Sequence, residues 1–453
     1  MLESMKTDRK MVPKIILGVL MPTIAILAGI FLPDAQRYAH VYEPNSLAEK
    51  CHGLSVYMEA KPPATSSTAA NDTQEQIRVT FTAEEILYDF DYMIAVLEAN
   101  FPSFGIIYRR NGVDMLSVAQ DLREQLERKE GYISFTTFVE LLREDFFRFT
   151  HPVGHLRIAG LWELGLVKGR FYGLQPFYQM LSMHSGLRLD SSWIFIPPVG
   201  RRRLTTQIIE DGRIAYLAYA GLMDWAMSRD DRHILEKFAD EISGFEHLII
   251  DMRDSRGGHP RFFYEFIAPL FAQNFHQTTI RNFYQAGDHN ISHMRLRRGL
   301  IGAPFDISQV GNIFPGEYLS QEILDDLSAM DYMFTDTIAV WPRGNFNGKI
   351  WMLVGPYMFS ASQTVATFAE SSGFATLVGE TTGGMAVTHS ISSNYFALPN
   401  TSIVIRYDHA FITDSRGRPL EYGTEPHYFN RPGMDAMETV LALIEEGWYR
   451  RDE

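Results

Sequence analysis

The sequence is poor in cysteine and in basic residues, and both shortages exclude classes of protein. The 453 residues include one cysteine, Cys51, so an intrachain disulfide and a cysteine-based zinc site are excluded and a packed core must stabilise the chain. Lys and Arg total 41 and Asp and Glu total 55, which gives a net charge of −14. Because phosphate binding draws its affinity from Lys and Arg, this charge argues against a nucleic-acid partner.

Signals for metal catalysis are equally scarce. The sequence contains no His-Glu-x-x-His motif. His151 and His155 are four residues apart, but Pro152 and Gly154 between them disfavour a regular helix that would present both rings on one face. We therefore expect neither a metal ion nor an organic cofactor.

The overall composition is that of a globular protein. Hydrophobic residues make up 46% of the chain and charged residues 21%, which excludes disorder, collagen and coiled coil as overall descriptions. At about 150 residues per domain, the length predicts two or three units. We find no internal repeat.

The N-terminal region carries a membrane-targeting pattern. Residues 15–32 contain no charge and follow four basic residues within residues 1–14. The positive-inside rule then makes residues 1–14 a cytoplasmic tail and places the rest of the chain outside the cytoplasm. No Ala-x-Ala cleavage site follows closely, so we favour an uncleaved transmembrane anchor over a signal peptide. Residues 33–77, with a stretch rich in Pro, Ser and Thr, are expected to be a linker.

Residues 78–150 are expected to form a small helical domain. Their apolar residues recur at helical spacing after Thr82, a candidate N-cap, and breaks are expected at Phe101-Pro102 and at Asn111-Gly112.

Residues 151–440 are expected to form an α/β domain. From Arg213 onward, continuous apolar strands alternate with helices, which indicates a parallel or mixed sheet covered on both faces. Residues 441–453 are expected to be a C-terminal tail.

Ser360 lies at the expected start of a helix. The apolar strand 350–354 leads through Gly355-Pro356 into this helix. Free amides and the dipole at a helix N-terminus favour a developing negative charge, so the amide of Ala361 could donate to an acyl oxyanion. The alternative is that Ser360 or Ser362 simply caps the helix.

The pair Gly257-Gly258 follows another apolar strand, which ends near Asp251. Paired glycines let a backbone amide approach a ligand closely, so Gly258, or Gly257 as its neighbour, could supply a second oxyanion donor. The alternative is an ordinary turn.

These segments resemble the tail-specific, or C-terminal-processing, serine peptidases. The run DMRDSRGG at 251–258 is similar to the family's Asp-x-Arg-x-Asn-x-Gly-Gly, with Ser255 in place of the Asn. The runs SASQ at 360–363 and VGETTGG at 378–384 resemble the nucleophile segment and the motif that follows it, with Gln363 in place of an acidic residue. The resemblance extends over roughly residues 82–426.

The resemblance implies that Ser360 is the nucleophile, and it leaves two kinds of base. In the Ser-Lys branch the lysine would stand at Met385, and no lysine occurs after Lys349, so that mechanism is excluded. In the branch typified by the tricorn core protease the base is a histidine, and VGHL at 153–156 resembles its segment and nominates His155, with His389 as the alternative.

The same branch places its acid in a Leu-Glu-x-x-Gly-x-x-Pro-Asp pattern near the C-terminus. The run LEYGTEPH at 420–427 resembles this pattern and nominates Glu421. Glu425 is nearby, and a salt bridge to Arg416 or Arg418 would explain Glu421 equally well. In such a triad the histidine takes the proton from the serine and the acid fixes its tautomer.

The resemblance also implies a crotonase-like (ClpP/crotonase) sheet-and-helix fold for the catalytic domain. We expect a membrane-anchored, extracytoplasmic serine peptidase that hydrolyses polypeptides through an acyl-enzyme. The segment between His155 and the strand after Gln207 is too short for a PDZ domain. Residues 171–180, rich in aromatics, could line a peptide groove or belong to the core. Two alternatives stay open: a non-catalytic ligand-binding protein on the same scaffold, as in the interphotoreceptor retinoid-binding repeats, and an esterase or amidase with the same triad.

Overall fold

The computed structural model describes residues 80–160, 204–219, 229–258, 260–298, 302–317, 319–384 and 393–447. The predicted anchor at 15–32, the linker at 33–77 and the aromatic stretch at 171–180 lie outside these ranges. Among the described helices, none combines the length and the apolar character needed to cross a membrane.

The main sheet has six strands in the order β15-β11-β10-β6-β5-β4. Five of them run parallel, and β4 pairs with β5 in the antiparallel sense at one edge. The strands are β4 (Leu204–Glu210), β5 (Ile214–Tyr219), β6 (His247–Asp251), β10 (Lys349–Val354), β11 (Thr376–Gly379) and β15 (Tyr428–Phe429).

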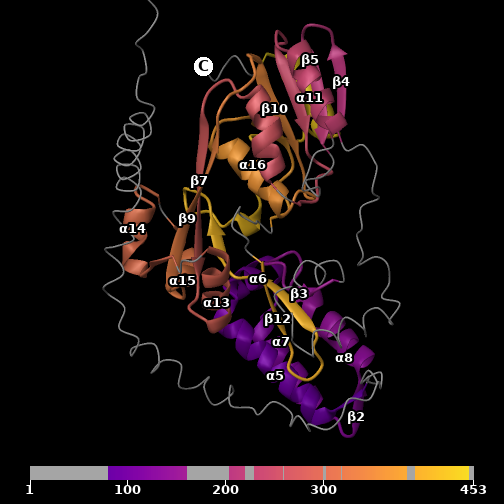
Figure 1. Ribbon diagram of the computed structural model, residues 1–453, viewed down its shortest axis with the longest axis vertical. Coiled ribbons are helices and arrows are strands. Elements are labelled where there is room, and N and C mark those ends of the chain that lie inside the picture. Colours follow the sequence, from indigo (N-terminus) through magenta and orange to yellow (C-terminus); the bar gives the residue numbers. More distant parts are fainter. Residues whose placement is uncertain are drawn as a thin grey trace, which may run out of the picture. The chain divides into compact units, whose positions relative to one another are not determined.

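Helices cover both faces of this sheet. On one face Met352 of β10 lies in the same core as helices α11 (Arg229–Glu241) and α16 (Ala361–Ser371). On the other face Trp351, the preceding residue, packs with helix α17 (Ala436–Glu445). Figure 1 shows α16 lying against the sheet beside β10. The predicted α/β sheet with two covered faces is therefore confirmed.

The predicted helical region contains four α-helices and a two-stranded ribbon. The capping box is present at Thr82, whose hydroxyl accepts from the amide of Glu85. The first helix ends at Asn100, and Gly112 ends the second in the left-handed conformation, so both predicted breaks are confirmed. These elements are β1 (Thr80–Thr82), α5 (Ala83–Asn100), α6 (Phe104–Asn111), α7 (Met115–Glu127), β2 (Tyr132–Ser134) and α8 (Phe135–Leu141).

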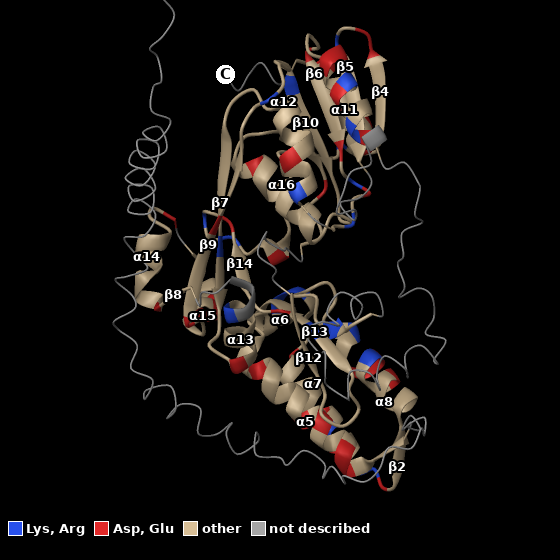
Figure 2. Cartoon of the chain, in the orientation of Figure 1, with Lys and Arg blue, Asp and Glu red and all other residues tan. Residues whose placement is uncertain are grey.

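These helices share their apolar core with residues much later in the chain. Phe283, Phe396 and Tyr407 are buried in the same cluster as the inner faces of α5 and α7. Red segments along α5 in Figure 2 mark its acidic residues, of which Glu84 and Glu98 are exposed and Asp89 is buried.

Two smaller antiparallel sheets complete the fold. One has the order β12-β13-β3, with β3 (Arg157–Ile158), β12 (Ser393–Ala397) and β13 (Val404–Asp408). The other has the order β14-β7-β9-β8, with β7 (His276–Tyr284), β8 (Ala303–Pro304), β9 (Tyr332–Val340) and β14 (Phe411–Thr413). The remaining described helices are η1 (Leu142–Phe146), η2 (Phe147–Phe149), η4 (Phe263–Ile267), α12 (Ala268–Phe271), α13 (Asp288–Arg298), η5 (Ile307–Gln309), α14 (Val310–Ile313), α15 (Gln321–Ser328) and η6 (Leu420–Tyr422).

Candidate active site

Ser360 is the residue at which the chain turns from strand β10 into helix α16. Its backbone has φ 59° and ψ −125°, a conformation that costs a non-glycine residue about 1–3 kcal/mol. Its amide donates to the carbonyl of Gly384 at 3.0 Å. Ser360 is the N-cap residue of α16 by position, but its side chain forms no capping hydrogen bond with this helix. The turn holds the hydroxyl at a helix N-terminus, the setting expected for a nucleophile.

The Gly257-Gly258 segment packs directly against Ser360. Gly257 has φ 89°, and a Cβ atom there would lie 2.9 Å from the Cβ of Ser360, so only glycine fits this close approach. The amide of Gly257 donates to the hydroxyl of Ser362 at 3.1 Å, and the hydroxyl of Ser255 pairs with it at 2.7 Å. Ser255, at the position of the family's Asn, therefore helps to fix this segment on α16.

These contacts narrow the candidates for the oxyanion donors. The Gly257 amide is occupied by the hydroxyl of Ser362, which leaves the neighbouring Gly258, an exposed residue, as the candidate from this segment. Ala361 is the first residue of α16, and first-turn amides have no acceptor within their own helix. A Cβ atom at Gly257 would also lie 3.5 Å from the Ala361 nitrogen, so both segments reach the same spot beside Ser360. The arrangement favours the amides of Ala361 and Gly258.

His155 lies in a tight turn just before strand β3. Its φ is 45°, a second left-handed non-glycine residue, and its side chain is buried. The flanking Val153 and Leu156, where the family has polar residues, are buried in the core of the helical region. Their packing holds the turn in place. Apolar contacts therefore stand here where the family has polar side chains.

The partner of the His155 ring is Asp408, at the end of strand β13. Nδ1 of His155 lies 2.6 Å from Oδ2 of Asp408, and both residues are buried. Strands β3 and β13 pair in the register Arg157 to Arg406, and the amide of Asp408 donates to the carbonyl of Gly154 at 2.7 Å. The pairing of two strands thus sets the position of the carboxylate against the ring.

Electrostatics suit this histidine to accept a proton. Burial lowers the pKa of His155, and the neighbouring Asp408 only partly opposes it, so the ring is neutral near pH 7. Burial tends to raise the pKa of Asp408, but His155, Arg406 and the hydroxyl of Ser393 together hold it below its usual value. An ionised carboxylate at Nδ1 keeps the proton on that nitrogen and leaves Nε2 as the acceptor.

Asp408 itself is held by one further hydrogen bond, from a hydroxyl that Arg406 supports in turn. The hydroxyl of Ser393 donates to its Oδ1 at 2.7 Å, and Arg406 binds the same hydroxyl at 2.8 Å. In the turn that precedes β13, Asp89 of α5 accepts from the amide of Thr401 at 2.7 Å. The helical region therefore anchors the strand that carries the carboxylate.

Glu421 does not make the contact that the sequence predicts for it. Nδ1 of His155 is taken by Asp408, and Oε2 of Glu421 instead accepts from the amide of Gly154 at 3.4 Å. The alternative partners Arg416 and Arg418 bind Glu370 and Asp414. The carboxylate that orients the ring is Asp408, and Glu421 supports the turn that precedes His155.

A chain of contacts joins the Ser360 and His155 segments. Gly384, whose carbonyl receives the Ser360 amide, lies against the carbonyl of Glu421, since a Cβ at Gly384 would be 2.2 Å from that oxygen. The side chain of Glu421 then contacts Gly154, the residue before His155. The alternative base His389 and Met385 lie outside the described residues.

Gln363 lies in a buried polar network below the site. Its amide nitrogen donates to the hydroxyl of Thr424 at 2.8 Å, and the hydroxyl of Thr382 donates to its oxygen. Thr367 pairs with Thr424 at 3.0 Å. This neutral network ties α16 to the loops after β11 and η6, so Gln363 acts here as a structural link.

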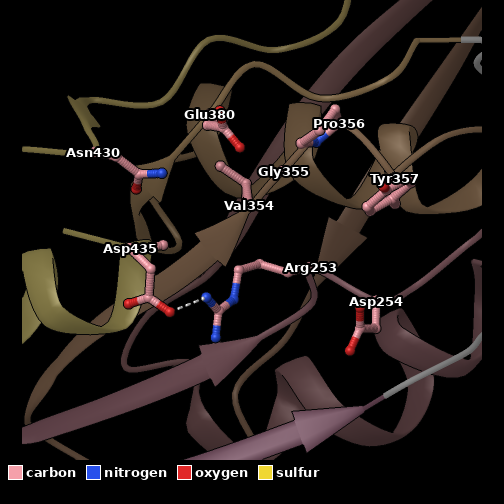
Figure 3. A pocket seen from close by; sticks show the side chains of 10 residues that line it. Arg253, Asp254, Val354, Gly355, Pro356, Tyr357, Glu380, Asn430 and Asp435 are labelled. Carbon is pink, nitrogen blue, oxygen red and sulfur yellow. Dashed lines mark hydrogen bonds and ion pairs between the residues drawn. The ribbon is translucent and has the colours of Figure 1, made fainter. Parts of the chain in front are cut away.

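A pocket of about 500 Å³ opens beside these segments. It lies at the carboxyl ends of β6, β10 and β11, where ligands bind to parallel sheets. Figure 3 shows Arg253 turned toward Asp435, with Asp254 and Glu380 on opposite sides. Arg256 stacks over the ring of Tyr357 at 5.3 Å and links the two loops that also carry Gly257 and Ser360.

Asp408 is the site residue that sequence reasoning missed. It ends an apolar strand, and its only sequence signal is an acid at the end of that strand. Its relation to His155, 253 positions away, depends on the register of β3 and β13, which no local spacing reveals.

Comparison with known proteins gives a family match and distant structural similarities. The family model described as peptidase family S41 matches residues 213–429. No curated protein matches this chain. A putative peptidase from Parabacteroides merdae ATCC 43184 is similar, with 14% identity, a TM-score of 0.49, and coverage of 80% of this chain and 96% of that one. Mature CPAF has 12% identity and a TM-score of 0.49, covering 77% and 92%. The photosystem II D1 C-terminal processing protease has 13% identity and a TM-score of 0.39, covering 77% and 94%.

Proposed function

We propose that the chain is a serine peptidase of family S41 and that it cleaves polypeptides with Ser360 as nucleophile, His155 as base and Asp408 as the carboxylate that orients the ring. The observation that carries this assignment is the buried contact of 2.6 Å between Nδ1 of His155 and Oδ2 of Asp408. A histidine held this way has the tautomer that accepts a proton at Nε2.

The proposed reaction has two steps. Neutral His155 takes the proton of the Ser360 hydroxyl as its oxygen attacks the scissile carbonyl, and the amides of Ala361 and Gly258 stabilise the resulting oxyanion. Asp408 stabilises the imidazolium, which returns the proton to the leaving amine and leaves an acyl-enzyme. Water, activated by the same histidine, then hydrolyses the ester on Ser360.

This assignment revises the predicted Ser-His-Glu triad. Glu421 contacts the amide of Gly154, so in this proposal it positions the turn that carries His155. The pocket lined by Arg253, Tyr357 and Glu380 would receive part of the substrate chain, because it adjoins the loops that bear Ser360 and Gly257.

We also propose that the enzyme is anchored in a membrane by residues 15–32 and acts outside the cytoplasm. The uncharged run and its basic N-terminal flank support this location. For the finer fold we propose a crotonase-like arrangement, which is supported by parallel strands with helices on both faces and a candidate nucleophile between β10 and α16.

Peptide-bond hydrolysis can be tested with a library of quenched fluorescent peptides and the full chain in mild detergent. The parent should cleave a subset of peptides, and Ser360→Ala should cleave none. Ser117→Ala, which changes an exposed serine of α7, serves as the matched control and should behave as the parent. Cleavage that persists in Ser360→Ala would overturn the assignment, and hydrolysis of ester probes without any peptide cleavage would favour an esterase.

A further inference from the structure

The last turn of helix α6 contacts three loops that belong to the candidate site. Arg109 donates to the hydroxyl of Tyr422 at 2.7 Å. Asn111 donates to the carbonyls of Phe149 and His151, at 2.6 and 3.1 Å, in the segment that leads to His155. Between them stands Arg110, whose contacts are made to backbone atoms of the catalytic loops.

Arg110 bridges two of these loops with one guanidinium group. Its Nη1 donates to the carbonyl of Glu421, and its Nη2 donates to the carbonyl of Gly383 at 3.0 Å. Glycine is needed beside it, because a Cβ at Gly384, where φ is 83°, would lie 2.8 Å from Nη1. The guanidinium therefore fills the junction at which the two loops meet.

Each of these loops leads by one further contact to a reacting group. Gly384, next to Gly383, accepts the amide hydrogen bond of Ser360. Glu421 accepts the amide hydrogen bond of Gly154, the residue before His155. A single side chain thus lies at the crossing of the path to the candidate nucleophile and the path to the candidate base.

We propose that Arg110 is a positioning residue that holds Ser360 and His155 at their working separation. This inference rests on the proposed function, because it assigns these two residues to the reaction. It also makes α6, a helix of the N-terminal region, part of the machinery that assembles the site.

The chemistry of arginine suits this task better than that of lysine. A guanidinium presents several N–H donors in a rigid fork and can serve two carbonyls at a fixed separation, whereas an ammonium is a point charge on a flexible stem. Burial lowers the pKa of Arg110, and the nearby Glu421 opposes this effect. Arg110 is half-buried, and both of these hydrogen bonds go to backbone carbonyls. Such contacts suit a residue that fixes the positions of two loops.

The test compares Arg110→Ala and Arg110→Lys with Arg123→Ala in the full chain. Arg123, on α7, forms an exposed ion pair with Asp91 and serves as the matched control for loss of an arginine. The rate of Ser360 modification by a fluorophosphonate should fall about 100-fold in Arg110→Ala, because a misplacement of about 1 Å costs this much. The rate of Ser360 modification should also be reduced in Arg110→Lys. Guanidinium ion at low concentration should restore part of this rate in Arg110→Ala, whereas methylammonium should not.

Amide hydrogen exchange supplies a readout that does not depend on activity. Exchange should become faster at residues 380–384 and 420–424 in Arg110→Ala and should be unchanged there in Arg123→Ala. The inference is overturned if Arg110→Ala is modified as fast as Arg123→Ala, or, where Arg110→Ala does not fold, if Arg110→Lys is modified at the rate of the parent. A parent that is never modified, with exchange changed as expected, would contradict the proposed function and leave the positioning of the loops by Arg110 supported.

Discussion

Replacing Asp408 by Asn tests the assignment of the orienting carboxylate. The change keeps the shape of the side chain and removes its charge at a buried position. An amide can present its NH₂ group to Nδ1 of His155, which forces the ring proton onto Nε2. The ring can then no longer accept the proton of Ser360, although the backbone of the site is intact.

The expected loss follows from the geometry of this one contact. In a Ser-His-Asp triad, the corresponding loss of the carboxylate lowers kcat about 10⁴-fold, or about 5.5 kcal/mol in activation free energy. The same loss is expected for Asp408, because its Oδ2 lies 2.6 Å from Nδ1 of His155 and both side chains are buried. Glu421→Gln should cost at most about tenfold, because the hydrogen bond that Glu421 accepts from the Gly154 amide is long and a glutamine oxygen can also accept it.

Both variants can be measured by the rate of hydrolysis of the best library peptide and by thermal unfolding. We expect Asp408→Asn to fold and to be nearly inactive, with Glu421→Gln close to the parent. The reasoning would be refuted if Asp408→Asn kept parental kcat, or if Glu421→Gln lost more activity than Asp408→Asn.

Three further outcomes are expected. Because burial lowers the pKa of His155, the neutral base persists below the ordinary histidine value of about 6.5, so kcat/KM plotted against pH should fall only below that value, and an acidic limb centred above about pH 7 would contradict this. Gly257→Ala should reduce modification of Ser360 about 100-fold, since the new Cβ would lie 2.9 Å from the Cβ of Ser360, and parental labelling would count against the packing described. Gln363→Ala removes two buried hydrogen bonds, with the hydroxyls of Thr424 and Thr382, and should lower the free energy of unfolding by about 1–3 kcal/mol in calorimetry; an unchanged unfolding midpoint would show that the network contributes little.

The main sheet could be predicted because its physical signals are local. Buried parallel strands read as continuous apolar runs, and the alternation of Trp351 and Met352 between two cores explains why such a run has no polar face. Thr82 and Gly112 mark a helix start and a helix end by their own chemistry, without help from distant residues.

The candidate site was only partly accessible from the sequence for the opposite reason. The start of a helix at Ser360 is a local property and was predictable. The partner of His155 depends on the pairing of β3 with β13, and the place of Arg110 depends on two loops that meet only in the folded chain. Glu421 was nominated from a motif, and the motif could not tell a contact with the ring from a contact with the backbone of Gly154.

The central claim is that His155, oriented by Asp408, activates Ser360 for acyl transfer. Its most direct test is intact mass spectrometry of the full chain after treatment with a fluorophosphonate, for the parent, Ser360→Ala and His155→Ala. The account predicts one adduct on the parent and none on either folded variant. Absence of an adduct on the folded parent, or an adduct that persists in Ser360→Ala, would contradict it.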